Sequence, residues 1–185
     1  WKIEEGMLTV LADEANSKGE HIVTMDQFGN FELVLDFRVT KGANSGIRYF
    51  VNEERTVSAC EYQILDDKKH PDASKGTNGN RKLASLYDLV PAEPLSSGVK
   101  KDPFKGVGKW NRATIVSKDG KVEHWLNNVK MVEYDRYSQM FEALVLYSKY
   151  SGHENFGRWD AGNIMLHDHH DEVSFRSIKI RELND

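Results

Sequence analysis

Cysteine is nearly absent from this chain of 185 residues, in which Cys60 is the only one. A single cysteine excludes an intrachain disulfide and a cysteine cluster for zinc, in whichever compartment the protein works. The chain also lacks any apolar run of about 18 residues, so we expect no membrane-spanning helix. It opens at Trp1 and not at methionine, which is typical of a trimmed sequence in which an export signal would no longer be visible.

An excess of basic residues is missing as well. The 25 Lys and Arg residues are interspersed with 29 Asp and Glu residues, which gives a net charge of -4 and a pI near 6.0. This balance excludes the basic face that nucleic acid or an anionic membrane would require. We therefore expect a neutral small molecule as the partner.

The commonest pattern in the chain is the alternation of apolar and polar residues. From Phe31 to Val39 every odd position is apolar, while Glu32, Asp36 and Arg38 take the other side, which is typical of a half-buried strand. Shorter stretches of this kind predict strands at residues 7–11, 47–51, 60–65, 83–89, 113–117, 122–126, 164–166 and 173–180. Many short strands in a chain long enough for one core indicate a single all-β domain over residues 1–185, a sandwich or a barrel.

Three segments depart from this pattern. Residues 137–149 place apolar side chains between Met140 and Tyr147 at helical spacing, which predicts one short helix. Residues 66–81 and 90–108 are rich in Gly, Pro, Ser, Asn and charge, which predicts long loops. Long loops inside a compact domain are usually functional or mobile.

The last predicted strand changes phase. Val173 and Phe175 share one face, but Ile178 and Ile180 share the other. A β-bulge near Arg176–Ser177 would bring both pairs onto the core. Alternatively, the two isoleucines cover the outer side of the sandwich, and the period alone does not decide between these structures.

Glu61 and Gln63 occupy alternate positions of one predicted strand and point to the same side, whereas Cys60, Tyr62 and Ile64 point to the other. The apolar set belongs in the core, which leaves a carboxylate and an amide on the opposite face. There they could act as a general base and as a hydroxyl-binding group. The alternative is a solvated outer face, where most Glu and Gln side chains of strands lie.

Arg48 and Phe50 alternate in the same way with Ile47, Tyr49 and Val51. If this strand neighbours the one that carries the carboxylate, the arginine stands beside it, where a guanidinium could hold a substrate oxygen or an oxyanion. The alternative is a surface salt bridge, worth about 0–1 kcal/mol.

Glycine is concentrated just before this strand, at Gly42 and Gly46 on either side of Asn44. These residues permit unusual backbone angles, so the segment indicates a turn that leads into the strand. It lacks the spacing of a phosphate-binding loop.

The densest polar cluster of the chain is His167, Asp168, His169, His170 and Asp171. If strand geometry continues through it, His167 and His169 face the same way, and two imidazoles at this spacing can bind one divalent metal ion. The alternative is a turn in which Asp168 or Asp171 accepts hydrogen bonds from nearby backbone amides.

His124 shares the face of Val122 and Leu126. Either it is a core histidine satisfied by a hydrogen bond, or this face is the one that binds substrate. Trp110 and Trp125 could stack on the ring of a ligand, although aromatic residues of sandwiches more often belong to the core.

Several spaced segments carry a family resemblance. They read GANSGI at residues 42–47, EYQILDD at 61–67, VEHWLN at 122–127, LHDH at 166–169 and DEVSFR at 171–176. Together they resemble the 3-keto-disaccharide hydrolase family, and the resemblance extends from Trp1 to Arg181. It implies a concanavalin A-like jelly roll of two antiparallel sheets with a substrate groove on the concave one. It also implies an extracytoplasmic protein, periplasmic or secreted.

The chain departs from that family at two positions. His167 stands where glutamine is usual, and His170 stands where glycine is usual. A metal site at His167 and His169 would therefore be particular to this chain, whereas Asp168 and His169 match the motif.

The resemblance implies cleavage of a glycoside that carries a ketone at C3. The ketone acidifies the C2 proton, so a base can remove it and the enolate can expel the aglycone from C1. Addition of water at C1 would then give net hydrolysis. No nicotinamide-binding motif is present, so a separate oxidoreductase is expected to make the ketone. We expect Glu61 or His169 as the base, Arg48 or a bound cation as the electrophile, and Tyr87 or His124 as the acid. We expect the sugar to bind at Gln63, Asp66, Asp168 and Trp125.

Two other functions compete with this one. An ordinary glucanase of the same fold would need two carboxylates, about 5–5.5 Å apart in a retaining enzyme. The partner of Glu61 at alternate spacing is Gln63, and Asp66 has the opposite parity, so only a carboxylate such as Asp168 could complete that pair. A non-catalytic carbohydrate-binding module would need no more than aromatic residues and amides.

Overall fold

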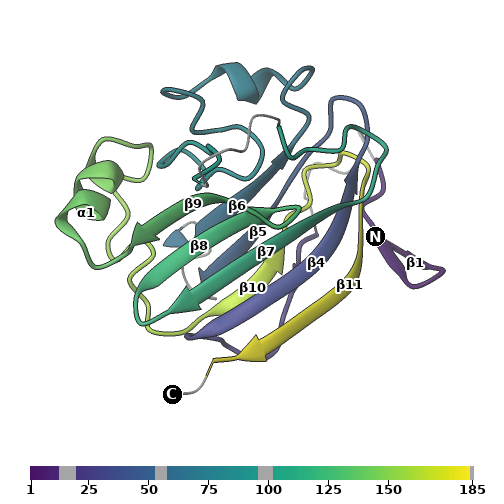
Figure 1. Ribbon diagram of the computed structural model, residues 1–185. Coiled ribbons are helices and arrows are strands. Elements are labelled where there is room, and N and C mark those ends of the chain that lie inside the picture. Colours follow the sequence, from purple (N-terminus) through teal and green to yellow (C-terminus); the bar gives the residue numbers. More distant parts are fainter. Residues whose placement is uncertain (13–19, 53–57, 96–101, 184–185) are drawn as a thin grey trace.

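The computed structural model describes residues 1–12, 20–52, 58–95 and 102–183. Within these residues, two antiparallel sheets of seven and four strands pack against each other (Figure 1). The larger sheet consists of β1 (Lys2–Glu4), β2 (Met7–Thr9), β4 (Phe31–Val39), β7 (Asn111–Lys118), β8 (Lys121–Leu126), β9 (Val129–Asp135) and β11 (Val173–Glu182). The smaller sheet consists of β3 (Ile22–Val23), β5 (Asn44–Val51), β6 (Cys60–Leu65) and β10 (Asn163–Leu166). The predicted two-sheet sandwich is confirmed.

The strand order places distant parts of the chain side by side. It is β1-β2-β11-β4-β7-β8-β9 in the larger sheet and β3-β10-β5-β6 in the smaller one. Residues 113–132 belong to a meander, in which β7, β8 and β9 are consecutive neighbours. In the smaller sheet β5 lies between β6 and β10, so that side chains from three separate segments meet on one surface.

The core lies between the sheets, and alternation along the strands produces it. In β4 the odd positions from Phe31 to Val39 are buried and the even ones are only half-buried. The smaller sheet contributes Tyr49 and Tyr62 to the same core, and both are fully buried. Each large apolar side chain buried in this way stabilises the fold by about 1.5–3 kcal/mol. The smaller sheet therefore turns its other set of side chains away from the core.

The single predicted helix is confirmed as α1 (Gln139–Leu146), which follows β9 (Figure 1). Its N-cap is Ser138, whose hydroxyl accepts a hydrogen bond from the amide of Phe141 at 3.2 Å. Phe141 is buried and stacks on Tyr134, with ring centroids 5.4 Å apart. This contact attaches the helix to the sandwich and sets the direction of the chain after it.

The strand predicted at residues 83–89 is wrong. The segment makes only isolated bridges, from Leu86 to Tyr62 and to Val90. Ala84 and Asp88 have φ angles of 66° and 64°, and residues in this left-handed region cannot continue a strand. The segment is still bonded to the edge of β6, so it extends the smaller sheet as a series of turns.

Two bulges modify the predicted faces. In β11 the register shifts between Arg176 and Lys179, which confirms the bulge, and Ile180 packs on the core while Ile178 stays 42% exposed. In β5, Phe50 has a φ of 58° and is buried in the core, not beside Arg48 as the alternation predicted. Two residues of a bulge oppose one on the neighbouring strand, which reverses the alternation beyond it.

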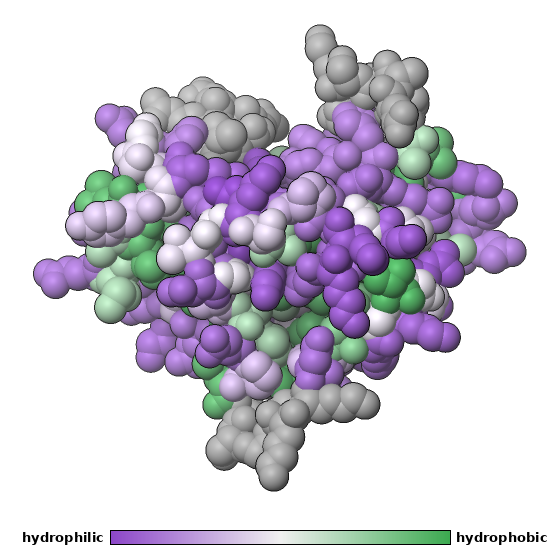
Figure 2. Space-filling view, turned by 90° about the horizontal axis from the view of Figure 1, so that it is seen from above, coloured by the Kyte–Doolittle hydropathy of each residue, from purple (hydrophilic) through white to green (hydrophobic). Residues whose placement is uncertain are grey.

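The predicted loops cover one end of the sandwich. Residues 66–81 contain a short 3-10 helix, η2 (Pro71–Ser74), and the loop at 90–108 falls partly outside the described residues, at 96–101. Seen from the side of these loops, the surface is mostly hydrophilic and its apolar residues form small separate areas (Figure 2). In the part of the chain that the structure describes, no helix is long and apolar enough to cross a membrane.

Candidate active site

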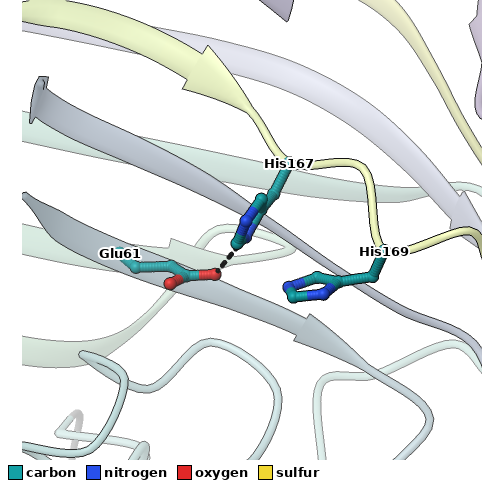
Figure 3. A group of neighbouring side chains, drawn as sticks. All are labelled: Glu61, His167 and His169. Atoms are coloured by element: carbon teal, nitrogen blue, oxygen red, sulfur yellow. Dashed lines mark hydrogen bonds and ion pairs between the residues drawn. The ribbon is translucent and has the colours of Figure 1, made fainter. Parts of the chain in front are cut away.

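A cluster of charged and titratable side chains lies on the outer face of the smaller sheet. Glu61 comes from β6, Arg48 from β5 and His167 from the residue that follows β10. The two strands that carry Arg48 and Glu61 are neighbours, and cross-strand pairing puts these residues directly beside each other. The condition stated for their contact is therefore confirmed. Figure 3 shows the rings of His167 and His169 directed toward the Glu61 carboxylate.

Gly46 makes this meeting possible. Neighbouring strands lie about 4.8 Å apart, so Glu61 on β6 must reach across β5 to contact a residue of β10. Gly46 occupies the crossing point, and a Cβ atom there would lie 2.1 Å from Glu61 Oε1. With this space free, Glu61 Oε1 lies 3.2 Å from His167 Nδ1. Gly46 thus belongs to β5 itself and not to the turn before it, where Gly42 has a φ of 75°.

Glu61 is buried but stays ionised. Its side chain is 3% exposed, and Arg48 Nε donates to its second oxygen, Oε2, at 3.1 Å. Burial by itself would raise the pKa of this carboxyl, but the charge of Arg48 and the hydrogen bond with His167 lower it to about 2. Both oxygens are therefore occupied, and the carboxylate is a weak base.

Three imidazoles gather around this carboxylate. The ring of His167 lies 3.9 Å from that of His169 and 4.5 Å from that of His21, measured between centroids. Partial removal from water and the neighbouring His167 both lower the pKa values of His21 and His169, so these two rings are neutral near pH 7. His169 is exposed, and among the described residues its ring makes no hydrogen bond.

Sequence reasoning missed His21. It precedes β3, far from the other two histidines in the chain, and it is held in place by the amide of Asp168, which donates to His21 Nδ1 at 3.1 Å. No local pattern marks it, because pairing of β3 with β10 alone brings it to the cluster.

Glu61, His167 and His169 could hold a divalent cation. One ligand atom from each residue can be chosen so that all lie within 4.8 Å of one another. An ionised carboxylate and two imidazoles suit ions such as Zn²⁺ or Mn²⁺. An ion at this place would have to compete with Arg48 and His167 for the oxygens of Glu61.

Tyr87 and His124 do not supply the expected acid. The hydroxyl of Tyr87 donates to Asp72 Oδ2 at 2.6 Å, and burial together with Asp72 raises its pKa above the ordinary value of 10.0. His124 is fully buried between the sheets, where Tyr49 Oη lies 2.7 Å from its Nε2 and the carbonyl of Ala84 lies 3.0 Å from its Nδ1. Burial lowers the pKa of His124 to about 4, so it is a neutral core histidine.

The tryptophans lie on the wrong face for this site. Trp125 is on the outer side of the larger sheet, where its Nε1 donates to Glu123 at 2.8 Å and Lys130 Nζ lies 5.2 Å from its ring. Trp110 is flanked by Arg38 and Arg176. The core separates both rings from Glu61, so the expectation that Trp125 stacks on a sugar bound there is wrong.

The other residues expected to bind sugar are Gln63, Asp66 and Asp168, and each lies in a different environment. Gln63 shares the face of Glu61 but is only 1% exposed, and its Oε1 has no partner among the described residues. The Asp66 carboxylate accepts the amides of Gly42 at 2.9 Å and Lys68 at 3.1 Å, which ties two loops together. Asp168 accepts the amide of His170 at 2.8 Å, as the turn interpretation had it.

A cation that the sequence did not reveal approaches the cluster from the segment after α1. Lys149 Nζ lies 4.1 Å from the ring centroid of Tyr87 and 5.0 Å from that of Tyr150. The charges of Glu61 and Arg48 both act on its pKa. The helical pattern of residues 137–149 predicted a helix and contained no sign of this contact.

Comparisons with known proteins find a matching family and a named relative. Residues 1–181 match the family described as the 3-keto-alpha-glucoside-1,2-lyase-like domain. A protein named 3-keto-disaccharide hydrolase from Bacteroides thetaiotaomicron is 33% identical, over all of this chain and 70% of that protein.

Two solved structures from Parabacteroides distasonis ATCC 8503, both provisionally named glycosyl hydrolases, are similar to this chain. One has a TM-score of 0.84 at 25% identity, and the match covers 100% of this chain and 84% of the chain in that structure. The other has a TM-score of 0.73 at 27% identity, and the match covers 99% of this chain and 90% of the chain in that structure. The sandwich is thus the jelly-roll kind found in glycosyl hydrolase and carbohydrate-binding folds. Because the match extends over nearly the whole chain, this protein belongs to the 3-keto-alpha-glucoside-1,2-lyase-like domain family, whose members' names support a carbohydrate-acting enzyme.

Proposed function

We propose that this protein cleaves glycosides whose sugar carries a ketone at C3, by removing the C2 proton and expelling the aglycone from C1. The observation that carries the proposal is the contact of a buried guanidinium–carboxylate pair with the imidazole of His167, and of this ring with that of His169, on one face of the smaller sheet. Such a cluster offers a cation for an enolate oxygen and a base for a carbon acid side by side.

His169 is the base in this proposal. Its ring is exposed and neutral and makes no hydrogen bond within the described part of the chain, so a nitrogen lone pair is available to the C2 proton. Glu61 is less suited, because it is buried and both of its oxygens are bonded. We assign Glu61 the role of holding Arg48 and His167 in place, and Arg48 the role of stabilising the negative charge that develops on the C3 oxygen.

The electrons balance without an oxidant. The C2–H pair forms the enolate, the enolate reforms the C3 ketone, and the new C1–C2 double bond expels the aglycone oxygen with the bonding pair. Addition of water to that double bond gives net hydrolysis. A separate oxidoreductase must supply the C3 ketone, since elimination neither makes nor consumes one.

A divalent cation is a second candidate for the electrophile. The observation that favours it is the grouping of the ligand atoms of Glu61, His167 and His169 within 4.8 Å. Exhaustive chelation followed by an activity assay separates the two arrangements. Unchanged turnover leaves Arg48 as the electrophile, and turnover that is lost and then restored by an added divalent ion assigns this role to the metal.

The experiment that tests the proposal compares a 3-keto-glucoside with its parent glucoside. Turnover of the ketone alone is expected, with a primary isotope effect when C2 carries deuterium, because this bond breaks in the elimination. Turnover of the parent would favour an ordinary glycoside hydrolase. Binding of either sugar without turnover would favour a carbohydrate-binding module and sink the proposal.

A further inference from the structure

The elimination leaves one role unfilled. The aglycone departs as an alkoxide unless an acid protonates its oxygen, and an alkoxide is a poor leaving group. His124 is enclosed in the core, and the hydroxyl of Tyr87 is bonded to Asp72. Neither can deliver a proton to a substrate bound at Glu61.

Lys149 is held against the segment that borders the strand of Glu61. Its backbone amide donates to Asp88 Oδ2 at 3.0 Å, which fixes the turn after α1. Its Nζ lies over the rings of Tyr87 and Tyr150, at 4.1 Å and 5.0 Å from the centroids. Tyr87 is anchored in turn, since its amide donates to the backbone carbonyl of Glu61 at 3.0 Å. The ammonium group is thus tied through its ring contact to the strand that carries the site.

The proton of Lys149 is not committed to a neighbour. Among the residues that the structure describes, no carboxylate forms an ion pair with it, and the side chain is exposed. Asp88 accepts the backbone amide of Lys149, but its carboxylate is paired with Arg81 at 2.5 Å. The groups whose charges act on Lys149 are Glu61, Arg81, Asp88 and Arg48.

From this geometry, and resting on the proposed function, we infer that Lys149 is the general acid of the elimination. As the C1–O bond breaks, the aglycone oxygen takes the bonding pair and a proton from the Lys149 ammonium. The products are the free aglycone alcohol, a neutral amine and the unsaturated 3-keto sugar. The amine regains its proton from solvent before the next cycle.

The surroundings of Lys149 suit this role. Burial of its inner part lowers its pKa below the ordinary 10.5, although Glu61 acts in the opposite direction. A lowered pKa makes the ammonium a better acid. Because the acid must be protonated, turnover is lost as the pH rises through the pKa of Lys149, and this alkaline limb should disappear in a variant without the amine.

The decisive experiment varies the leaving group. Lys149→Met and Lys149→Arg are assayed with a 3-keto-glucoside of a simple alkyl alcohol and with that of 4-nitrophenol, whose anion leaves without protonation. We expect both variants to lose about 10²–10⁴-fold in kcat on the alkyl substrate and little on the nitrophenyl substrate. The arginine variant keeps the charge but cannot release a proton at working pH.

Several outcomes overturn the inference. Equal losses on the two substrates would place Lys149 at the ketone or in binding, and full activity of Lys149→Arg would reduce its role to charge. Trapping of the substrate on Lys149 by borohydride would make it a covalent catalyst. Lys179→Met, on β11 of the larger sheet, is the control that leaves both rates unchanged, and melting curves verify folding. Failure of the wild-type protein on every 3-keto-glucoside would instead refute the proposed function, and the inference with it.

Discussion

Charged pairs lie on the outer faces of both sheets, but their surroundings differ. On the larger sheet Arg112 pairs with Asp36 at 3.0 Å, and 48% of the arginine side chain remains exposed. On the smaller sheet Arg48 pairs with Glu61 at nearly the same distance, 3.1 Å, with exposures of only 13% and 3%. A screened pair contributes about 0–1 kcal/mol, whereas burying two charges has a desolvation cost that the pair barely offsets. The buried pair is therefore better explained by chemistry than by stability.

Aromatic residues follow the same division. On the larger sheet Trp110 and Trp125 lie under the cations of arginine and lysine side chains, an arrangement common on protein surfaces. On the smaller sheet the rings are imidazoles and phenols, and their pKa values are shifted from the ordinary ones. On the larger sheet the pKa shifts of Lys130 and Glu133 come from their exposed ion pair, whereas those of His21 and His169 come first from burial, which marks the face of the smaller sheet as the functional one.

The largest expected effect is the loss of turnover when the carboxylate of the buried pair is neutralised, compared with neutralising the carboxylate of the exposed pair. Glu61→Gln keeps the shape of the side chain but loosens Arg48 and His167, so we expect kcat on a 3-keto-glucoside to fall about 10²–10⁴-fold. Asp36→Asn removes the matching charge from the larger sheet and should leave kcat unchanged. Steady-state kinetics on both variants, with melting curves, make the measurement. Near-normal kcat in a folded Glu61→Gln protein would contradict our account of the smaller sheet.

A smaller effect is expected from Gly46→Ala. The added methyl group would lie 2.1 Å from Glu61 Oε1, which is a steric overlap, and would displace the carboxylate from His167. A displacement of about 1 Å can cost about 10²-fold in rate, and we expect a kcat loss of that order with a folded protein. Gly152→Ala is the matched control, because nothing lies within 4 Å of a Cβ atom at that position. Equal kcat values for the two variants would rule out the crossing point as a functional feature.

The third prediction concerns stability at low pH. The folded protein lowers the pKa of Glu61 to about 2, so the carboxylate contributes stability that is present above about pH 4.5 and lost as the pH falls toward 2. This contribution is at most about 3 kcal/mol. Glu61→Gln should therefore show a flatter fall in the free energy of unfolding between pH 4.5 and 2, measured by urea denaturation. Asp36→Asn should follow the wild-type curve, and parallel curves for all three proteins would contradict the ionised, buried carboxylate.

The smallest expected effect is that of Trp125→Ala. The ring lies on the larger sheet, separated from Glu61 by the core, so we expect kcat and KM on a 3-keto-glucoside to stay within about twofold of wild type. Its loss should alter only the packing of Lys130 and Glu123. A large rise in KM would show that sugar reaches the larger sheet and would break the distinction between the two faces.

Alternation predicted most of the sandwich, and it failed where the backbone leaves the extended region. The strands from Phe31 to Val39 and from Cys60 to Leu65 lie where the period of two placed them. The failures at residues 83–89 and at Phe50 coincide with positive φ angles at non-glycine residues. Sequence patterns carry little information about such residues, because the surrounding structure holds them in unfavourable conformations.

The candidate site was predicted in part for the same reason. Strand parity correctly paired Glu61 with Arg48 on one face, and the spacing of His167 and His169 correctly brought both to one place. Parity cannot distinguish the inner face of one sheet from the outer face of the other, so Trp125 was placed in the wrong site. Tyr87 was chosen for its chemical type, although its hydrogen-bond partner, Asp72, decides its acidity.

The sequence by itself determined the all-β class, the single helix and the sidedness of Glu61, because these depend on side-chain alternation and spacing along one segment. Only the tertiary structure decided which segments meet. Strand order brings His21 to Asp168, and the turn after α1 brings Lys149 to Tyr87, and both contacts connect residues far apart in the chain. The ionisation of Glu61 was decided in the same way, since it depends on the distance to Arg48 and on the exclusion of water, and local sequence specifies neither.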